Sequence, residues 1–163
     1  MPNLIRNDAL ETHDKPTWQF CSETNLTLHF DKPITLQKQQ LCWALAEHIG
    51  KLPTVAEVVI GMNTLSVFTQ PLTFTELNSL KQQLTELSEQ IDGQSIEGKY
   101  VEIPVQYGGE YGPDLKPMAQ ALGLSVEEVV KLHSEAIYTV YFIGFQPGFP
   151  YLGGLSEKLY FPR

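Results

Sequence analysis

The sequence predicts an α+β fold with two successive units of mixed strands and helices. Three observations support this: short segments with strand-like alternation of apolar residues, helical periodicity that follows capping residues, and a polar, glycine-containing break between the two parts. The 163 residues are 42% hydrophobic, which suffices for one medium domain or two small ones. We expect a loose segment at 1–16, an α+β domain at 17–92, a linker at 93–99 and a second domain at 100–163.

The first unit opens with two strands and a helix. Thr17–Phe20 and Leu26–Phe30 alternate as half-buried strands do, and the polar turn Ser22–Asn25 lets them pair. Thr35 then opens a helix in which apolar residues recur every three or four positions until Gly50 and Pro53 end it.

A hairpin and a second helix complete the first unit. Val55–Ile60 and Thr64–Thr69 are rich in Val, Ile and Thr and flank a glycine-containing turn. Thr73 and Glu76 form a capping-box pattern that starts an amphipathic helix reaching Ile91. Strands, helix, hairpin and helix in this order predict a ferredoxin-like type of α+β sandwich, with the helices on one face of an antiparallel sheet.

The second unit mixes short strands and helices with glycine-rich loops. Tyr100–Gln106 alternates like a strand, Pro113 suits the first position of a helix that Gly123 ends, and Ser125 with Glu128 caps another helix. Ile137–Phe145 is almost continuously apolar, as in a strand buried on both faces. These elements are too few to enclose a core, so we expect strands from beyond Arg163, from another chain or from the first unit to complete it.

Charge and composition exclude several classes of function. The formal net charge of -8, without a cluster of Lys and Arg, argues against a nucleic-acid partner. Residues 1–14 resemble neither a signal nor a transit peptide, and no window approaches the roughly twenty apolar residues of a membrane span. Cys21 and Cys42 are interpreted as two buried thiols, and we expect a cytoplasmic protein. The four histidines have no metal-ligand spacing, so no metal site is expected.

A phosphate-loop-like segment, Gly93–Lys99, does not predict nucleotide binding. Tyr100 stands where Ser or Thr would bind magnesium, and a helix precedes the segment while a strand follows it, which is the reverse of the required order. We therefore expect this chain to bind no cofactor of its own.

The first candidate site is the glycine-rich loop 108–114. Its glycines allow the backbone to approach a ligand, and the unpaired N–H groups at the start of the following helix would suit an anion such as a carboxylate. The alternative is a tight turn that binds nothing. The candidate residues are Gly108, Gly109, Glu110, Gly112 and Asp114.

The second candidate site is the loop 144–154, GFQPGFPYLGG. Prolines pre-order its backbone and glycines leave room beside its aromatic rings, which suits the wall of an apolar pocket. The alternative is a compact loop that packs its own aromatics. The candidate residues are Phe145, Pro147, Gly148, Phe149, Pro150, Tyr151, Gly153 and Gly154.

His133 is the remaining candidate, and it lies on the apolar face of its predicted helix. It is either a structural histidine or a residue with a direct catalytic role.

Three motifs in order resemble the B subunit of 5-oxoprolinase, a family also called allophanate hydrolase subunit 1 or the Kip-inhibitor family. They are IPVQYGGEYGPDL at Ile103–Leu115, GLSVEEVVKLH at Gly123–His133 and YFIGFQPGFPYLGGL at Tyr141–Leu155. A weaker likeness at Pro53–Val67 extends the resemblance to most of the chain. It implies that a cyclophilin-like β-barrel follows the α+β domain, and that this barrel is incomplete because family members continue well past Arg163.

The resemblance also implies a function. Family members act with the A and C subunits of an ATP-dependent enzyme that opens the lactam of 5-oxo-L-proline to L-glutamate, and ATP is used by the complex. By resemblance, His133 would be catalytic, and the two loops would bind substrate and face the C subunit. A histidine-kinase inhibitor and a carboxyltransferase domain of the allophanate hydrolase or urea carboxylase type are the alternatives. We expect this chain alone to be inactive.

Overall fold

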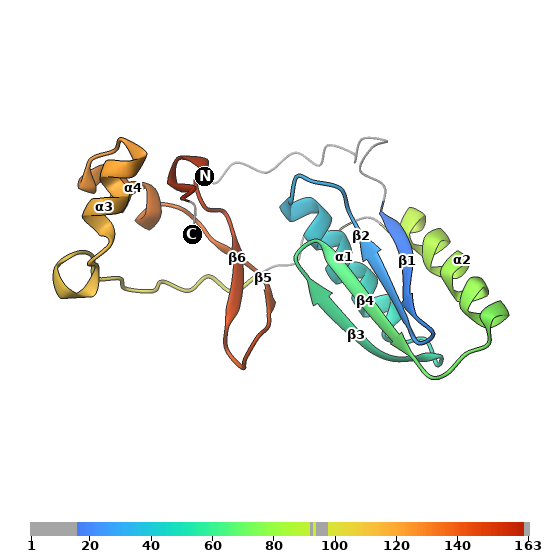
Figure 1. Cartoon of the computed structure of the whole chain (residues 1–163). Coiled ribbons are helices and arrows are strands. Elements are labelled where there is room, and N and C mark those ends of the chain that lie inside the picture. Colours follow the sequence, from blue (N-terminus) through green and yellow to red (C-terminus); the bar gives the residue numbers. More distant parts are fainter. Residues whose placement is uncertain (1–15, 92, 94–97, 162–163) are drawn as a thin grey trace. The chain divides into compact units, whose positions relative to one another are not determined.

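The computed structural model describes residues 16–91, 93 and 98–161 (Figure 1). The expected loose segment at 1–16 lies outside these residues except for Pro16, and so does most of the expected linker at 93–99. The chain divides into two compact units, Met1–Ile96 and Glu97–Arg163, each of which is described by itself.

An antiparallel sheet forms one layer of the first unit (Figure 1). Its strands lie in the order β1-β2-β4-β3, and all neighbouring pairs are antiparallel, as predicted. The ladder places Leu28 opposite both Trp18 and Leu65, so apolar side chains form a row across the sheet. The strands are β1 (Thr17–Ser22), β2 (Asn25–His29), β3 (Val55–Gly61) and β4 (Thr64–Thr69).

Two helices cover this apolar row. Both α1 (Leu36–Ile49) and α2 (Phe74–Gln90) begin where the sequence predicts, because Thr35 and Thr73 cap them and Glu76 completes a capping box. Leucines of both helices and of strands β2 and β4 form one buried cluster. In the same core, Trp18 Nε1 donates to Ser88 Oγ at 3.0 Å, which links β1 to α2.

A buried polar network fixes the β3–β4 turn to the start of α1. Asn63 adopts a φ of 49°, as a tight hairpin turn requires, and its side-chain oxygen accepts from Thr35 N at 2.7 Å. Its backbone N–H donates to Gln39 Oε1 at 2.8 Å. The pairing satisfies polar groups that would otherwise be costly to bury.

In the second unit, the described residues form the helices α3 (Leu115–Leu122) and α4 (Val126–Ser134) and a hairpin of β5 (Thr139–Ile143) with β6 (Pro150–Gly153). Gly123 ends α3 in the left-handed conformation, and Ser125 with Glu128 forms the predicted capping box of α4. Short 3₁₀ turns lie at Gly109–Tyr111 and Glu157–Leu159. Its small core contains Ala119, Val129 and Leu159.

One strand prediction for this unit is wrong, and another holds only in part. Tyr100–Gln106 has no strand partner among the described residues, and its apolar side chains are exposed, Ile103 to 77%. Ile137–Phe145 shortens to β5, where only Tyr141 is buried, because a two-stranded sheet without covering layers leaves both faces open. The described residues form no closed barrel.

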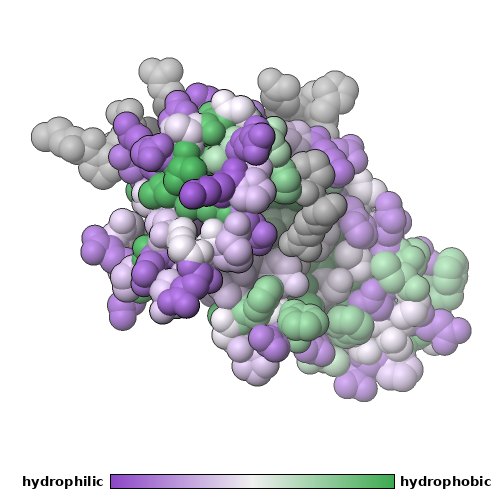
Figure 2. All heavy atoms as spheres, turned by 60° about the vertical axis from the view of Figure 1, so that its left-hand side comes forward, coloured by the Kyte–Doolittle hydropathy of each residue, from purple (hydrophilic) through white to green (hydrophobic). Residues whose placement is uncertain are grey.

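Exposed apolar side chains are therefore common in the second unit. They include Val101, Ile103, Val105, Val140, Ile143, Phe145, Leu152 and Phe161. Figure 2 shows apolar side chains at the molecular surface between polar ones. Surfaces of this kind commonly mark places where other protein segments bind.

Two expectations about the whole chain can be compared with the described residues. Cys42 is buried but Cys21 is exposed, which corrects the prediction of two buried thiols, because Cys21 lies near the end of the sheet's outer strand β1. Within the part of the chain that the structure describes, no helix has the length and apolar character needed to cross a membrane.

Candidate functional site

The predicted glycine-rich loop lines a cavity of about 710 Å³ in the second unit. Gly108, Gly109 and Gly112 line one part of it, and residues of α4 line another. Two lysines and two glutamates also contribute, namely Lys116, Lys131, Glu127 and Glu135. The cavity thus combines backbone groups of a glycine loop with charges of both signs.

The backbone of the loop depends on its glycines. Gly108 and Gly109 have φ values of 77° and 59°, which disfavour side chains. A Cβ on Gly112 would lie 2.7 Å from Gly108 N, so the loop closes tightly on itself. Apart from Gly109 itself and its two chain neighbours, no heavy atom of the described residues lies within 4 Å of a Cβ built on Gly109, which leaves its surroundings open to a ligand.

Two other residues predicted for this loop lie away from the cavity wall. Glu110 and Asp114 are exposed and do not line the cavity. The helix prediction is also corrected here, because α3 begins at Leu115 and not at Pro113. A 3₁₀ turn at Gly109–Tyr111 intervenes between the glycines and the helix, and Asp114 precedes the helix without a side-chain capping bond.

His133 contacts two tyrosines and does not line the cavity. The Tyr107 hydroxyl is 2.6 Å from His133 Nδ1, and the Tyr107 and His133 rings meet edge to face at 5.7 Å. From the other direction, the Tyr138 hydroxyl donates to the backbone oxygen of His133 at 3.1 Å. Burial raises the pKa of Tyr138 above that of a free tyrosine, and the nearby Tyr107 side chain adds to this. His133 therefore meets the cavity through Tyr107, which does line it.

The segment 144–154 is largely a hairpin. Gly144 N–H donates to Phe149 O at 3.1 Å, and residues 150–153 form strand β6. Phe142 and Tyr151 stack at 4.4 Å, and Phe149 meets Tyr151 edge to face at 5.5 Å. The aromatics thus pack on one another, and none of them lines the cavity of the glycine loop.

The glycines and prolines of the hairpin have local structural roles. A Cβ on Gly153 would overlap the Tyr141 ring, and one on Gly154, whose φ is 109°, would lie 2.5 Å from Ile137 O. Gly148 has a φ of 77° in the exposed turn that contains Pro147. Pro150 is the first residue of β6, a position that tolerates proline. Phe145 is 86% exposed.

Sequence reasoning missed Tyr107, Lys116, Lys131 and Tyr138. Tyr107 directly precedes the glycine loop and lies within the motif at Ile103–Leu115, but it was not named as a site residue. The positions 127, 130, 131 and 134, which line the cavity, share one face of α4 by their spacing. This spacing could have indicated that these four positions share a surface, but the apolar residues of the same helix form a stronger pattern.

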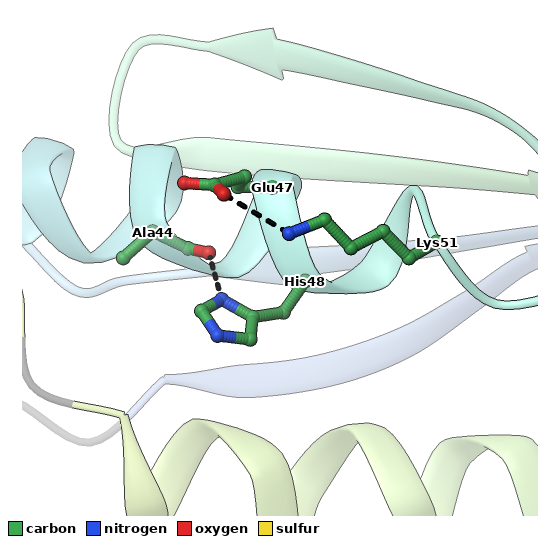
Figure 3. A network of polar contacts seen from close by, with 4 residues as sticks. All are labelled: Ala44, Glu47, His48 and Lys51. Atoms are coloured by element: carbon green, nitrogen blue, oxygen red, sulfur yellow. Dashed lines mark hydrogen bonds and ion pairs between the residues drawn. The ribbon is translucent and has the colours of Figure 1, made fainter.

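In the first unit, His48 makes a local polar contact within its own helix. Figure 3 shows His48 on α1, with Nδ1 2.9 Å from Ala44 O, beside the exposed Glu47–Lys51 ion pair at 3.0 Å. Among the residues that the structure describes, no group of three His, Cys, Asp or Glu side chains could hold a metal ion.

The fold and the glycine loop belong to a known class of protein. Residues 16–163 match the family described as "Carboxyltransferase domain, subdomain C and D", and the chain belongs to this family.

Individual relatives are more specific. The chain is 43% identical to the B subunit of 5-oxoprolinase from Haemophilus influenzae over 87% of its length, and 33% identical to the Bacillus subtilis protein of the same name over 86%. It spans 66% and 64% of these two relatives, slightly less than two thirds. A crystal structure of TTHA0988 matches 85% of this chain and 27% of its own with a TM-score of 0.64 and 34% identity.

Proposed function

We propose that this chain is part of the B subunit of an ATP-dependent 5-oxoprolinase, which opens the lactam of 5-oxo-L-proline to L-glutamate together with the A and C subunits. The observation that carries the proposal is the 43% identity to the B subunit of a 5-oxoprolinase across 87% of this chain. ATP is used by the complex, and this chain holds no cofactor.

The cavity gives this proposal a binding site. The backbone N–H groups of the loop 109–112 hold the carboxylate of 5-oxoproline or an oxyanion that develops during ring opening. The open space beside Gly109 supports this role, because the backbone can approach the ligand without a side chain between them.

The hairpin has a different role in the proposal. Phe145, 86% exposed, and Phe149, 43% exposed, present apolar rings that belong to the side facing the substrate and the C subunit. Further strands of a cyclophilin-like barrel cover the exposed apolar residues of β5 and of the segment 100–106. On its own, this chain is inactive.

Reconstitution tests the proposal. The full-length protein is combined with homologues of the A and C subunits, and glutamate release from 5-oxoproline is followed with and without ATP. We expect release that needs ATP and all three proteins. Release that does not change when this protein is omitted would show that it has another function.

The family description favours a second candidate, a carboxyltransferase domain of the kind found in biotin-dependent carboxylases. This candidate requires a partner that carries biotin. Co-purification separates the two functions, since a biotinylated carrier protein would support the carboxyltransferase, whereas homologues of the A and C subunits would support the 5-oxoprolinase.

A further inference from the structure

Tyr107 joins the two parts of the candidate site. It lines the cavity with Gly108 and Gly109, and its hydroxyl lies 2.6 Å from His133 Nδ1. His133 does not line the cavity, although the sequence marked it as the catalytic candidate. The Tyr107 hydroxyl therefore gives His133 a direct contact with a residue that lines this cavity.

The direction of this hydrogen bond, which the tautomer of His133 sets, decides what Tyr107 can offer a ligand. A phenol has one proton to donate and lone pairs that accept. When the proton of Tyr107 is directed to His133 Nδ1, the phenol oxygen keeps only its accepting capacity for a ligand. Such a phenol oxygen pairs with an N–H donor of a ligand. A ligand that has no donor at this position leaves the oxygen without a hydrogen-bond partner.

His133 is itself held in place. The Tyr138 hydroxyl donates to its backbone oxygen at 3.1 Å, and the Tyr138 ring lies 5.5 Å from the imidazole. The Tyr107 ring also meets the imidazole edge to face. Together these contacts restrict the orientation of the imidazole and keep Nδ1 directed at the Tyr107 phenol.

We propose that Tyr107 is a specificity-determining residue that accepts the amide N–H of a small lactam carboxylate, and that His133 is its positioning residue. This inference rests on the proposed function for the choice of 5-oxoproline as ligand. The glycine loop holds the carboxylate, and Tyr107 recognises the ring nitrogen.

A pair of ligands that differ only at the ring atom tests this. Binding of 5-oxoproline is compared with binding of its lactone analogue, 5-oxotetrahydrofuran-2-carboxylate, in which oxygen replaces the N–H. Calorimetry with the full-length protein in its complex gives the ratio of the two dissociation constants. We expect the wild type to prefer the lactam by about tenfold or more, because a site built for a hydrogen bond rejects an analogue that lacks the donor.

Variants of Tyr107 and His133 then show which residue causes the preference for the lactam. Tyr107→Phe removes the hydroxyl and should bring the ratio close to one, while binding of the lactone changes little. His133→Leu should also lower the ratio, and His133→Gln should restore it, because the glutamine oxygen can accept the phenol proton. A structural role alone would weaken both ligands together.

The outcomes separate this inference from the proposed function. A wild-type ratio near one, a ratio that Tyr107→Phe leaves unchanged, or no binding of either ligand overturns the role of Tyr107. Glutamate release by the reconstituted complex is measured in parallel and reports on the proposed function alone. An active complex without a lactam preference would leave the function standing and refute only this inference.

Discussion

A single added methyl group at Gly109 tests whether the glycine loop binds the ligand. Gly109 has a φ of 59°, and a Cβ placed there meets no heavy atom of the described residues within 4 Å other than those of Gly109 itself and its chain neighbours. Gly109→Ala should therefore cost only the strain of a left-handed alanine, about 1–2 kcal/mol. The same methyl group enters the space that the substrate carboxylate would occupy beside the loop.

Gly123 provides a matched control. Its φ is 68°, its Cβ would also meet nothing within 4 Å, and it does not line the cavity. Gly123→Ala should lose about the same 1–2 kcal/mol of stability, since both variants carry the same backbone strain. The two substitutions thus differ mainly in their distance from the candidate ligand.

Binding and unfolding are measured on both variants. Urea unfolding should give similar losses of free energy for the two. Calorimetric titration with 5-oxoproline should show affinity about tenfold or more weaker in Gly109→Ala, equivalent to about 1.4 kcal/mol, and little change in Gly123→Ala. Equal affinities in the two variants would refute the assignment of the loop as the carboxylate site.

Three further predictions concern the first unit. Burial raises the pKa of the Cys42 thiol to about 12. Iodoacetamide at pH 8 should therefore modify the exposed Cys21 and leave Cys42 intact until the protein unfolds, which peptide mass spectrometry would show. Equal labelling of the two cysteines in the native state would contradict this. Hydrogen bonds from Thr73 lower the pKa of Glu76 below its usual value. This stabilisation is present above the unfolded pKa and is lost as pH falls through the folded pKa. Thr73→Ala should therefore destabilise the fold more at pH 7 than at pH 3 in urea unfolding, and an equal loss at both pH values would be inconsistent with this. Leu84 is fully buried, so Leu84→Ala should cost about 2–5 kcal/mol in the same assay, and a loss below about 1 kcal/mol would contradict the described core.

Local sequence signals predicted the first unit well because its elements carry their own start and stop residues. Thr35, Thr73 and the turn before Thr64 lie where the sequence placed them. The apolar residues at Leu26 and Leu28 are fully buried, as their alternation predicts. In this unit, local preference and packing agree.

The second unit was harder to predict because strands depend on partners that are distant in sequence. Alternation at Val101 and Ile103 indicates a strand, but hydrogen-bonded neighbours decide whether one forms. The helices α3 and α4 were predicted in their places, since caps and periodicity are local, although α3 begins at Leu115 and not at Pro113. The family relationship was also recognisable from its motifs.

The site was only partly predictable for a related reason. Composition marked Gly108, Gly109 and Gly112, which the structure places along one cavity. It could not show that Tyr107 bridges the loop and His133, because that contact joins residues 26 positions apart. It also grouped the aromatics of 144–154 with the site, although in the described residues they pack within their own hairpin.

Mapping backbone amides of the full-length protein by NMR during titration with 5-oxoproline tests the central claim most directly. If the glycine loop is the binding site, the largest and saturable shifts should fall on Gly108, Gly109 and Gly112. Saturable shifts confined to the hairpin residues 145–151, with the glycine loop unchanged, would contradict it.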